Sequence, residues 1–480
     1  MNKRLLACLC LLLALSVFAG GCSWRIEAVD QLIRAPKLSG EYASLDKAFK
    51  DYLKAQNVQN SILKPPLSGE YRSAYVLYDI NGNGMNDALI FYAYTNDPNV
   101  VRVNILSYDG NKWFPVADYK GDGHNVHSVE FADLNRDGVD EVLISWQFSD
   151  SGNKNLSIIG CDLNDERQII GAQYLLSNEE YTQKVVVDLN LDGTNELFTA
   201  TIVTPEQRSV GKLLNYNQQE RKIMPEENGI IDLDVRASAY RPLKTDVVGS
   251  GEKKACRIYI DAVVQQSPAT MATEIVVWDS VRTRLLSPTL SAETRTVGND
   301  TLRTAKLEES RDINSDRQID IPTYSKLPDS KVRYTVDPKT EDLYIVEWKN
   351  YTDDLFKQIV RYIDYDNNAF RFMVPEGFDN FSVFIHATDA TGTQDNNKME
   401  FDELDPQKKE SGEPLFTIYS FTAAQWETEK ISGRKLEFLK RNQTRNTVYA
   451  CEIFERGKAR GINAEWVNKQ LWLLKEEEIR

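Results

Sequence analysis

Histidine, cysteine and long apolar stretches are scarce in this chain of 480 residues, which has three histidines and six cysteines. His124 and His127 share one segment and His386 lies far away, so no third ligand of matching spacing supports a transition-metal site. We expect the pair to face solvent or to make local hydrogen bonds. The motifs G-x-S-x-G and H-E-x-x-H and the phosphate-binding loop are also absent. The common hydrolase, metalloprotease and nucleotide-binding signatures are therefore excluded.

The cysteines do not form a disulfide framework. Cys8 and Cys10 lie in an apolar N-terminal stretch, and Cys161, Cys256 and Cys451 are far apart in the rest of the chain. A small, odd number of widely spaced cysteines predicts free, buried thiols.

Positive charge is also in short supply, with 57 basic against 72 acidic residues and a net charge of −15. Nucleic acids and anionic lipids repel such a surface at long range, so neither is expected as a partner. Bound divalent cations would offset part of this charge.

After the leader there is no apolar run that could cross a membrane, and the leader itself is short. Lys3 and Arg4 precede an apolar run from Leu5 to Ala19, and Gly20, Gly21 and Cys22 follow. This arrangement resembles the lipobox of bacterial lipoproteins, although that family prefers Leu, Val or Ile where Ala19 stands. The resemblance implies a signal peptide over 1–21 and lipidation of Cys22, which would anchor the protein to the cell membrane on its extracytoplasmic face. Ordinary signal-peptidase cleavage after Ala19 is the alternative.

What the chain has in abundance is an aspartate-rich loop. Three copies, Asp79–Asp87, Asp133–Glu141 and Asp188–Glu196, are nearly identical, and a fourth, Asp312–Asp320, is looser. They begin 54, 55 and 124 residues apart. The last interval is about twice the others, and a degenerate copy over Asp246–Asp261 fills the gap. We call the four clear copies loops 1 to 4.

Each loop places oxygen-bearing side chains at its first, third, fifth and ninth positions, which is the ligand chemistry that calcium prefers. Glycine at position six permits the sharp left-handed turn that lets alternate residues converge. A backbone carbonyl at position seven would complete the cage. The predicted ligands of two to four structural Ca²⁺ ions are Asp79, Asn81, Asn83, Met85 and Asp87; Asp133, Asn135, Asp137, Val139 and Glu141; Asp188, Asn190, Asp192, Thr194 and Glu196; and Asp312, Asn314, Asp316 and Asp320.

The loops are not expected to bind metal equally. Loops 2 and 3 each carry three carboxylates, loop 1 carries two, and loop 4 has Arg317 in place of the glycine. An EF-hand is excluded, because position twelve holds Ile90, Ile144 and Thr199 instead of glutamate and strands replace the flanking helices. Metal-free Asx turns are the alternative.

The flanking sequence predicts repeated β-structure. Short alternating strands follow each loop, and a second strand recurs farther on in each unit, as in Val103–Gly110 and Leu343–Trp348. The chain here resembles the FG-GAP/VCBS repeats, which are β-propeller repeats with calcium loops. That resemblance implies a mainly β fold, with a propeller over residues 71–367 of about five units and up to seven blades.

Two flanks complete the expected organisation. Residues 22–70 form a linker with an amphipathic helix over Ser44–Gln56, and 368–480 form a small α+β module. In the module we expect helices over Thr422–Ile431 and Asn463–Leu471, with Trp426, Trp466 and Trp472 packed in its core. A binding groove lined by the three tryptophans is the alternative.

These observations predict a lipid-anchored surface protein whose calcium-stabilised propeller is a binding or scaffold module for a protein or a glycan. It is not expected to be an enzyme. Two alternatives stay open. A secreted carbohydrate-active hydrolase would need only two suitably placed carboxylates, and a structural envelope lipoprotein would need no soluble ligand.

Overall fold

The computed structural model describes ten segments of the chain, namely 40–148, 152–203, 208–251, 254–266, 268–304, 307–334, 340–365, 370–387, 398–430 and 432–474. The predicted signal peptide and Cys22 lie outside them. In these segments no helix has both the length and the apolar character needed to cross a membrane.

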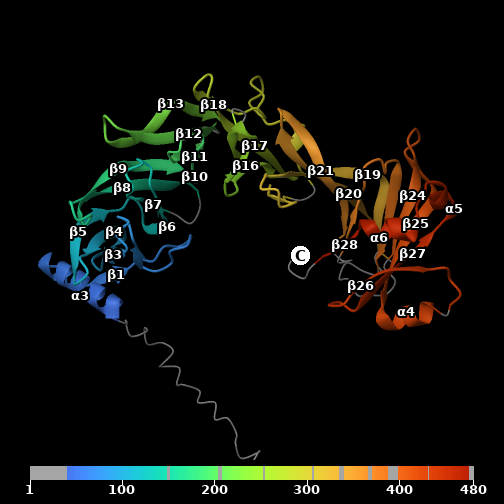
Figure 1. The fold of residues 1–480 in the computed structure, drawn as a ribbon, viewed down its shortest axis with the longest axis horizontal. Helices are drawn as coiled ribbons and strands as arrows, with labels where there is room; N and C mark the ends of the chain where they lie inside the picture. The colour runs from blue at the N-terminus through green and yellow to red at the C-terminus, as the bar shows by residue number, and fades with distance from the viewer. Residues whose placement is uncertain are drawn as a thin grey trace, which may run out of the picture.

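Four small antiparallel sheets follow one another along the chain and form an arc (Figure 1). Sheet 1 has β1 Ser61–Leu63, β2 Tyr75–Tyr78, β3 Asp87–Tyr94, β4 Asp97–Tyr108 and β5 Trp113–Lys120. Sheet 2 has β6 Asn125–Ala132, β7 Glu141–Gln147, β8 Lys154–Leu163 and β9 Ile169–Tyr181. Sheet 3 has β10 Gln183–Val187, β11 Glu196–Val203, β12 Arg208–Asn217 and β13 Lys222–Asp232. Sheet 4 has β14 Ala239–Tyr240, β15 Lys244–Val248, β16 Ala255–Gln266, β17 Ala269–Asp279 and β18 Arg284–Leu286, followed by the short 3-10 helix η2 Asn299–Thr301.

The sheets pack face to face because successive side chains of a strand point to opposite faces. In β3, Ile90 belongs to the apolar layer shared with the N-terminal helix, whereas Leu89 belongs to the layer shared with sheet 2. In β11, Leu197 packs toward sheet 2 and Phe198 toward sheet 4. Both faces of a sheet are therefore buried, which explains why these strands are almost continuously apolar.

Different elements cover the two ends of the stack. Helix α3 (Gly40–Ala55) packs Leu45, Phe49 and Leu53 on the outer face of sheet 1. This confirms the amphipathic helix predicted over Ser44–Gln56, although the helix begins at Gly40. At the other end, Tyr259 and Ile275 of sheet 4 pack against a fifth, larger sheet. In the described part of the chain the stack is thus an arc with covered ends.

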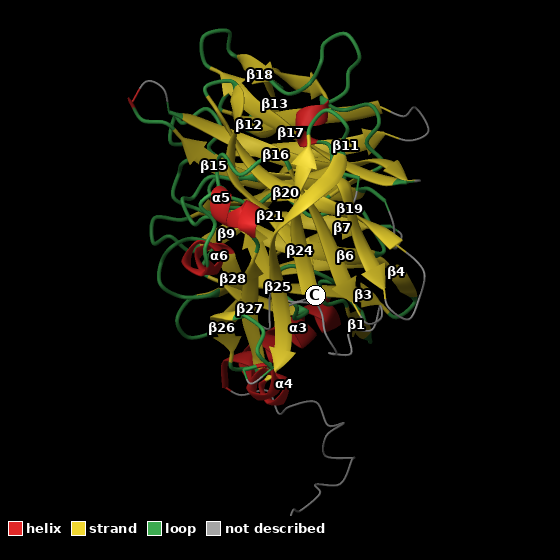
Figure 2. Cartoon of the chain, turned by 90° about the vertical axis from the view of Figure 1, so that its right-hand side faces the viewer, coloured by secondary structure: helices red, strands yellow, loops and turns green. Residues whose placement is uncertain are grey.

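The fifth sheet has ten strands, and Figure 2 views the molecule from the side on which this sheet lies. Its order is β26-β27-β25-β24-β23-β19-β20-β21-β22-β28, and β19 and β23 pair in parallel. Its edges approach each other where Lys440 of β26 donates to the Leu471 carbonyl of β28, which nearly closes the sheet into a barrel. The strands are β19 Ile321–Tyr334, β20 Thr340–Thr352, β21 Leu355–Tyr365, β22 Phe370–Met373, β23 Phe381–Ala387, β24 Lys398–Asp405, β25 Glu410–Thr422, β26 Glu437–Asn442, β27 Thr447–Ile453 and β28 Leu471–Leu473.

This sheet differs from the sequence-based organisation. The strands after loop 4 were expected to form a fifth blade, but β19, β20 and β21 belong to the ten-stranded sheet. The boundary expected between residues 367 and 368 falls between β21 and β22, which are hydrogen-bonded neighbours. Local periodicity identified the strands but could not show that β19 pairs with the distant β23.

The predicted helices of the C-terminal region are confirmed as α4 (Ala423–Glu429) and α6 (Ala464–Gln470), with α5 (Glu455–Ala459) between them. Thr422 and Asn463 cap α4 and α6 through their side chains. Trp426 is buried and Trp466 packs on the barrel core. The prediction for Trp472 is wrong, because its side chain is 58% exposed. Its neighbours Leu471 and Leu473 point into the barrel, so alternation along edge strand β28 turns Trp472 outward.

The three cysteines of the described segments are free, as predicted. Cys256 and Cys451 are buried and Cys161 is half-buried. Burial raises the pKa of the Cys256 thiol to about 11, and those of the other two to about 12. These thiols therefore act as small apolar groups.

Candidate metal centre

Loops 1, 2 and 3 occupy the same place in successive sheets. Each joins two antiparallel neighbours of one sheet, β2 to β3, β6 to β7 and β10 to β11. In each, position nine is the first residue of the outgoing strand and pairs with the last residue of the incoming one, as Tyr78 does with Asp87. Loop 4 repeats this register in the isolated bridge between Arg311 and Asp320, just before β19.

All four loops have the same hydrogen-bond geometry. The first aspartate accepts from the backbone N–H of position six at 2.8 to 3.0 Å. The side chain at position three accepts from the N–H of position five, and the side chain at position five accepts from the N–H of position seven. The sequence pattern thus encodes one tightly curled turn, built four times.

The curl depends on left-handed backbone at two positions. Position six has φ values of 85°, 77°, 87° and 68° at Gly84, Gly138, Gly193 and Arg317. Position four is left-handed as well, with Leu191 at 62°. The glycine predicted to permit the turn does so in three loops, and Arg317 adopts the same conformation at a steric cost.

Relief of that cost gives a first prediction. Arg317→Gly is expected to raise the free energy of unfolding by about 1 kcal/mol, because glycine adopts the left-handed conformation without a Cβ clash. The reciprocal variant Gly138→Arg should lower it by a similar amount. Urea denaturation of both variants and the wild type measures the two changes. Equal stability of Arg317→Gly and wild type would contradict the expected strain.

The carboxylates at position nine are buried. Asp87, Glu141, Glu196 and Asp320 are all at most 3% exposed. Burial raises their pKa values to about 6, 8, 7 and 6, respectively. Each accepts one backbone N–H from position two, while Oδ2 of Asp87 and Oδ1 of Asp320 have no hydrogen-bond partner among the described residues. A buried carboxylate with an unused oxygen needs a proton or a cation beside it.

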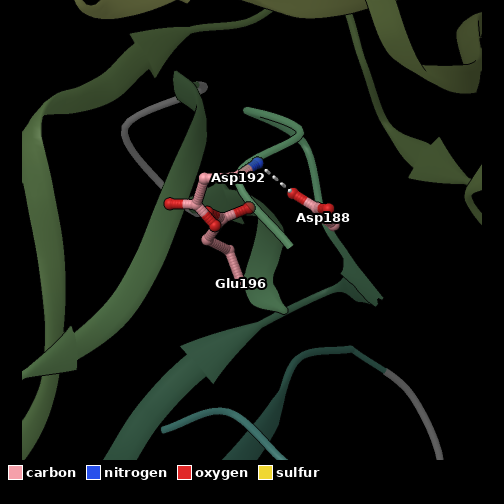
Figure 3. A group of neighbouring side chains, drawn as sticks. All are labelled: Asp188, Asp192 and Glu196. Carbon is pink, nitrogen blue, oxygen red and sulfur yellow. Dashed lines mark hydrogen bonds between the residues drawn. The ribbon is translucent and has the colours of Figure 1, made fainter. Parts of the chain in front are cut away.

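Loop 3 brings its carboxylates closest together. One oxygen each from Asp188, Asp192 and Glu196 lies within 4.8 Å of the other two, and Figure 3 shows the three side chains around the loop. Elsewhere in the described segments, no other set of three Asp, Glu, His or Cys side chains meets this distance. Loop 2, expected to match loop 3, does not, and there Asn135 donates its amide to Glu141 at 2.9 Å.

The donor set fits calcium in chemistry. The loops offer carboxylate and carboxamide oxygens, and an oxygen that accepts one N–H keeps a second lone pair for a cation. Loop 3 would hold the ion through Asp188, Asp192 and Glu196, and the Asn190 amide donates to Asp192 at 3.1 Å. Ligation by the carbonyls of Met85, Val139 and Thr194 stays a prediction.

Contacts between neighbouring units involve position eight, which sequence reasoning missed. The Asp140 N–H of loop 2 donates to the Ile80 carbonyl of loop 1 at 3.0 Å, and the Asn195 side chain of loop 3 donates to the Asp133 carbonyl at 3.3 Å. Arg167, from the β8–β9 turn, donates to carbonyls of both loops 1 and 2. Loops 1 to 3 therefore form one continuous ridge along the arc.

The chain matches no protein-family model and no curated protein.

The degenerate copy of the loop does not form an aspartate loop at Asp246, which lies in a strand. Asp246 lies in β15 and makes a buried ion pair with Arg257 at 2.7 Å. Its carboxylate also accepts the Ile319 N–H, which is position eight of loop 4, at 2.8 Å. Arg257 donates to the Tyr351 carbonyl of the ten-stranded sheet. An ion pair thus stands in sheet 4 where the other sheets carry an aspartate loop.

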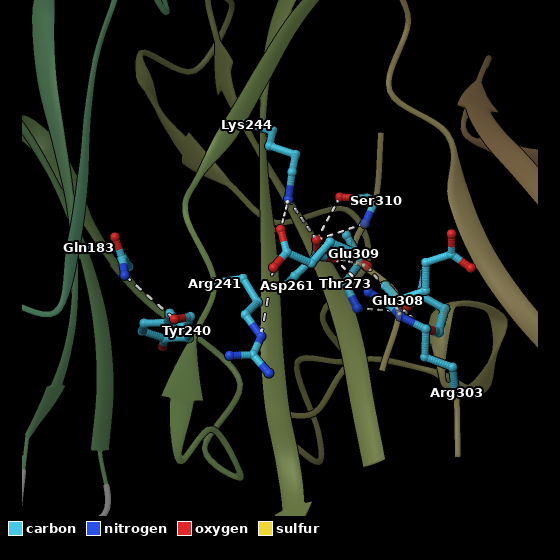
Figure 4. Close-up of polar contacts among 11 residues, drawn as sticks. Gln183, Tyr240, Arg241, Lys244, Asp261, Thr273, Arg303, Glu308, Glu309 and Ser310 are labelled. Carbon is cyan, nitrogen blue, oxygen red and sulfur yellow. Dashed lines mark hydrogen bonds and ion pairs between the residues drawn. The ribbon is translucent and has the colours of Figure 1, made fainter. Parts of the chain in front are cut away.

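A second charged cluster lies in the same sheet (Figure 4). Asp261 is 1% exposed and accepts from Arg303 at 2.7 Å, Thr273 at 2.6 Å and Lys244 at 3.2 Å. The N–H and hydroxyl of Ser310 also donate to it. Burial alone would raise the pKa of Asp261, but Arg303 and Lys244 hold it below its ordinary value. Every oxygen has partners, so the cluster is a structural clasp between β16 and the segment before loop 4.

Of the histidine pair, His124 faces solvent as expected, whereas His127 is half-buried and contacts a residue distant in sequence. His127 Nε2 lies 3.0 Å from the Ser68 hydroxyl, and burial lowers the pKa of His127. His124 is exposed and contacts the ring of Phe148.

Proposed function

We propose that the chain is a calcium-stabilised repeat scaffold of the FG-GAP/VCBS type, with sheets 1 to 4 as propeller-type blades arranged in an open arc. Four loops of one geometry, each closing on a buried acid, carry the proposal. Calcium in a loop would neutralise that acid and pin the two strands that it joins.

The scaffold is proposed to act at the cell surface, carried by a lipid on Cys22, and to bind a protein or a glycan. Long-range repulsion from the net charge of −15 disfavours nucleic acid. The continuous ridge of loops 1 to 3 supports a structural role for the metal, because it links the sheets to one another. In this proposal calcium shapes the surface and takes no part in a reaction.

Calcium removal provides the test. Calcium at a hundredfold excess over its dissociation constant should stabilise the fold by about 2.7 kcal/mol for each occupied loop, because it binds the folded state alone. Thermal melting in calcium and in chelator measures the effect. The variant Asp192→Asn/Glu196→Gln should lose the contribution of loop 3, while Asp97→Asn, at an exposed site outside the loops, should respond as the wild type does. Identical wild-type melting curves with and without calcium would refute the proposal.

A further inference from the structure

A pocket of about 610 Å³ and one of about 500 Å³ are among the cavities of the described segments. Charged residues contribute to the lining of the larger pocket, whereas the smaller is lined by uncharged residues alone. It lies at the N-terminal end of the arc, between the residues that follow α3 and the β3–β4 turn (Figure 1). A volume of this size suits a small ligand of one to a few rings. None of its lining residues carries a charge, although 27% of the chain is charged.

The polar lining consists of carboxamides and a hydroxyl. Asn57, Gln59, Asn60 and Asn96 contribute side-chain amides, and Thr95 contributes a hydroxyl. All five residues are exposed, and none of these side chains makes a hydrogen bond within the described part of the chain. Each amide can donate two hydrogen bonds and accept two. The pocket thus presents many unused donors and acceptors of mixed polarity.

The apolar part of the lining is held in place. Tyr94 and Val58 are half-buried, and the Tyr94 ring lies 5.2 Å from the Arg102 guanidinium and 5.8 Å from the Tyr92 ring. The Thr95 N–H donates to the Asn60 carbonyl at 3.3 Å, which joins the two walls. The aromatic surface is therefore fixed before any ligand arrives.

We propose that this pocket binds a neutral saccharide. Sugar hydroxyls donate and accept like carboxamides, and the apolar face of a sugar ring packs on an aromatic side chain. A charged ligand would need a lining cation or carboxylate to pair with, and the pocket has neither. The inference rests on the proposed function in choosing a glycan over a protein, but it needs no bound metal at the pocket.

Calorimetric titration of the full chain tests the proposal in calcium-containing buffer. The neutral probes are maltotriose, cellotriose and triacetylchitotriose, and trigalacturonic acid is the charged probe. At least one neutral probe should bind, and Asn57→Ala/Asn60→Ala should weaken its association by about tenfold, the effect of about two lost hydrogen bonds. The matched control is Asn178→Ala. Asn57 and Asn178 are both exposed with left-handed backbone (φ 57° and 58°), so backbone effects cancel.

Three outcomes overturn the saccharide site. They are no heat from any neutral probe at about 10 mM, equal binding of trigalacturonic acid, and unchanged affinity in the double variant. Loss of binding in chelator together with a lower melting temperature bears on the calcium proposal instead. The comparison of variants in calcium bears on the pocket alone, so the two failures are distinguishable.

Discussion

Replacement of Arg303 by methionine is expected to lower the free energy of unfolding by about 3–5 kcal/mol, the largest effect of any single substitution proposed for this chain. The Arg303 side chain is fully buried and donates to Asp261, Thr273 and two backbone carbonyls. Its removal leaves the buried Asp261 carboxylate with Lys244, at 3.2 Å, as the remaining cation in contact with it in the described structure. A buried charge that has lost its main partner costs more than the original pair contributes.

Urea denaturation of the Arg303 variant measures this effect. Arg208→Met is the matched control, because Arg208 also pairs with an aspartate but is 55% exposed, and its loss should cost about 0–1 kcal/mol. The double variant Arg303→Met/Asp261→Leu should recover much of the stability by removing both charges. If Arg303→Met and Arg208→Met destabilise equally, the buried cluster is not the clasp inferred above.

The second large effect concerns pH and Glu274. This residue of β17 is 2% exposed; its Oε2 accepts the Asp234 N–H at 3.0 Å, and Oε1 has no hydrogen-bond partner in the described part of the chain. Burial, with a smaller contribution from the charge of Asp234, raises the pKa of Glu274 from 4.5 to about 7, and Asp234 is itself paired with Arg236. Tyr240 is the other titratable neighbour.

The sign of the pH effect follows from the raised pKa. Below pH 4.5 the group is protonated in both folded and unfolded chains, and its favourable contribution is fully present. As pH rises from about 4.5 to about 7, the unfolded chain ionises more readily, so stability falls by up to about 3 kcal/mol and then stays at the lower value. Glu274→Gln cannot ionise and should therefore be more stable than the wild type at pH 8 but not at pH 5.

Urea unfolding of wild type and Glu274→Gln at both pH values, with calcium present throughout, isolates this group from the loop carboxylates. Exposed Glu293→Gln serves as the control and should track the wild type. A constant difference between Glu274→Gln and wild type from pH 5 to pH 8 would show that Glu274 does not titrate in this range.

Two kinds of stabilising contact therefore occur along the arc. Sheets 1 to 3 each close their first hairpin with an aspartate loop, whereas sheet 4 uses the ion pairs of Asp246 with Arg257 and Asp261 with Arg303. In an ion pair, the protein itself supplies the cation that neutralises the buried acid. A loop with a buried acid and no such partner needs a proton or an external cation.

Local sequence was informative wherever a few neighbouring residues decide the conformation. The glycines of loops 1 to 3 and the alternation of the strands predicted turns and strands that the structure contains. Position eight was overlooked because it supplies no expected metal ligand, and its polar residues Asp140 and Asn195 are replaced by Ile319 in loop 4. What they share is a contact with the preceding unit, and that contact exists only once the sheets are stacked.

By itself, the sequence determined the four aspartate loops, the strands around them and the charge that accompanies them, since hydrogen bonds and sterics over nine residues suffice to curl each loop. Tertiary structure decided the rest. It placed α3 on the outer face of sheet 1, paired β19 with β23 in parallel and gave Asp246 its buried partners. These contacts join segments that are separate in the chain. The physical reason is that burial of both faces of a sheet selects among many distant partners, and no local pattern records that choice.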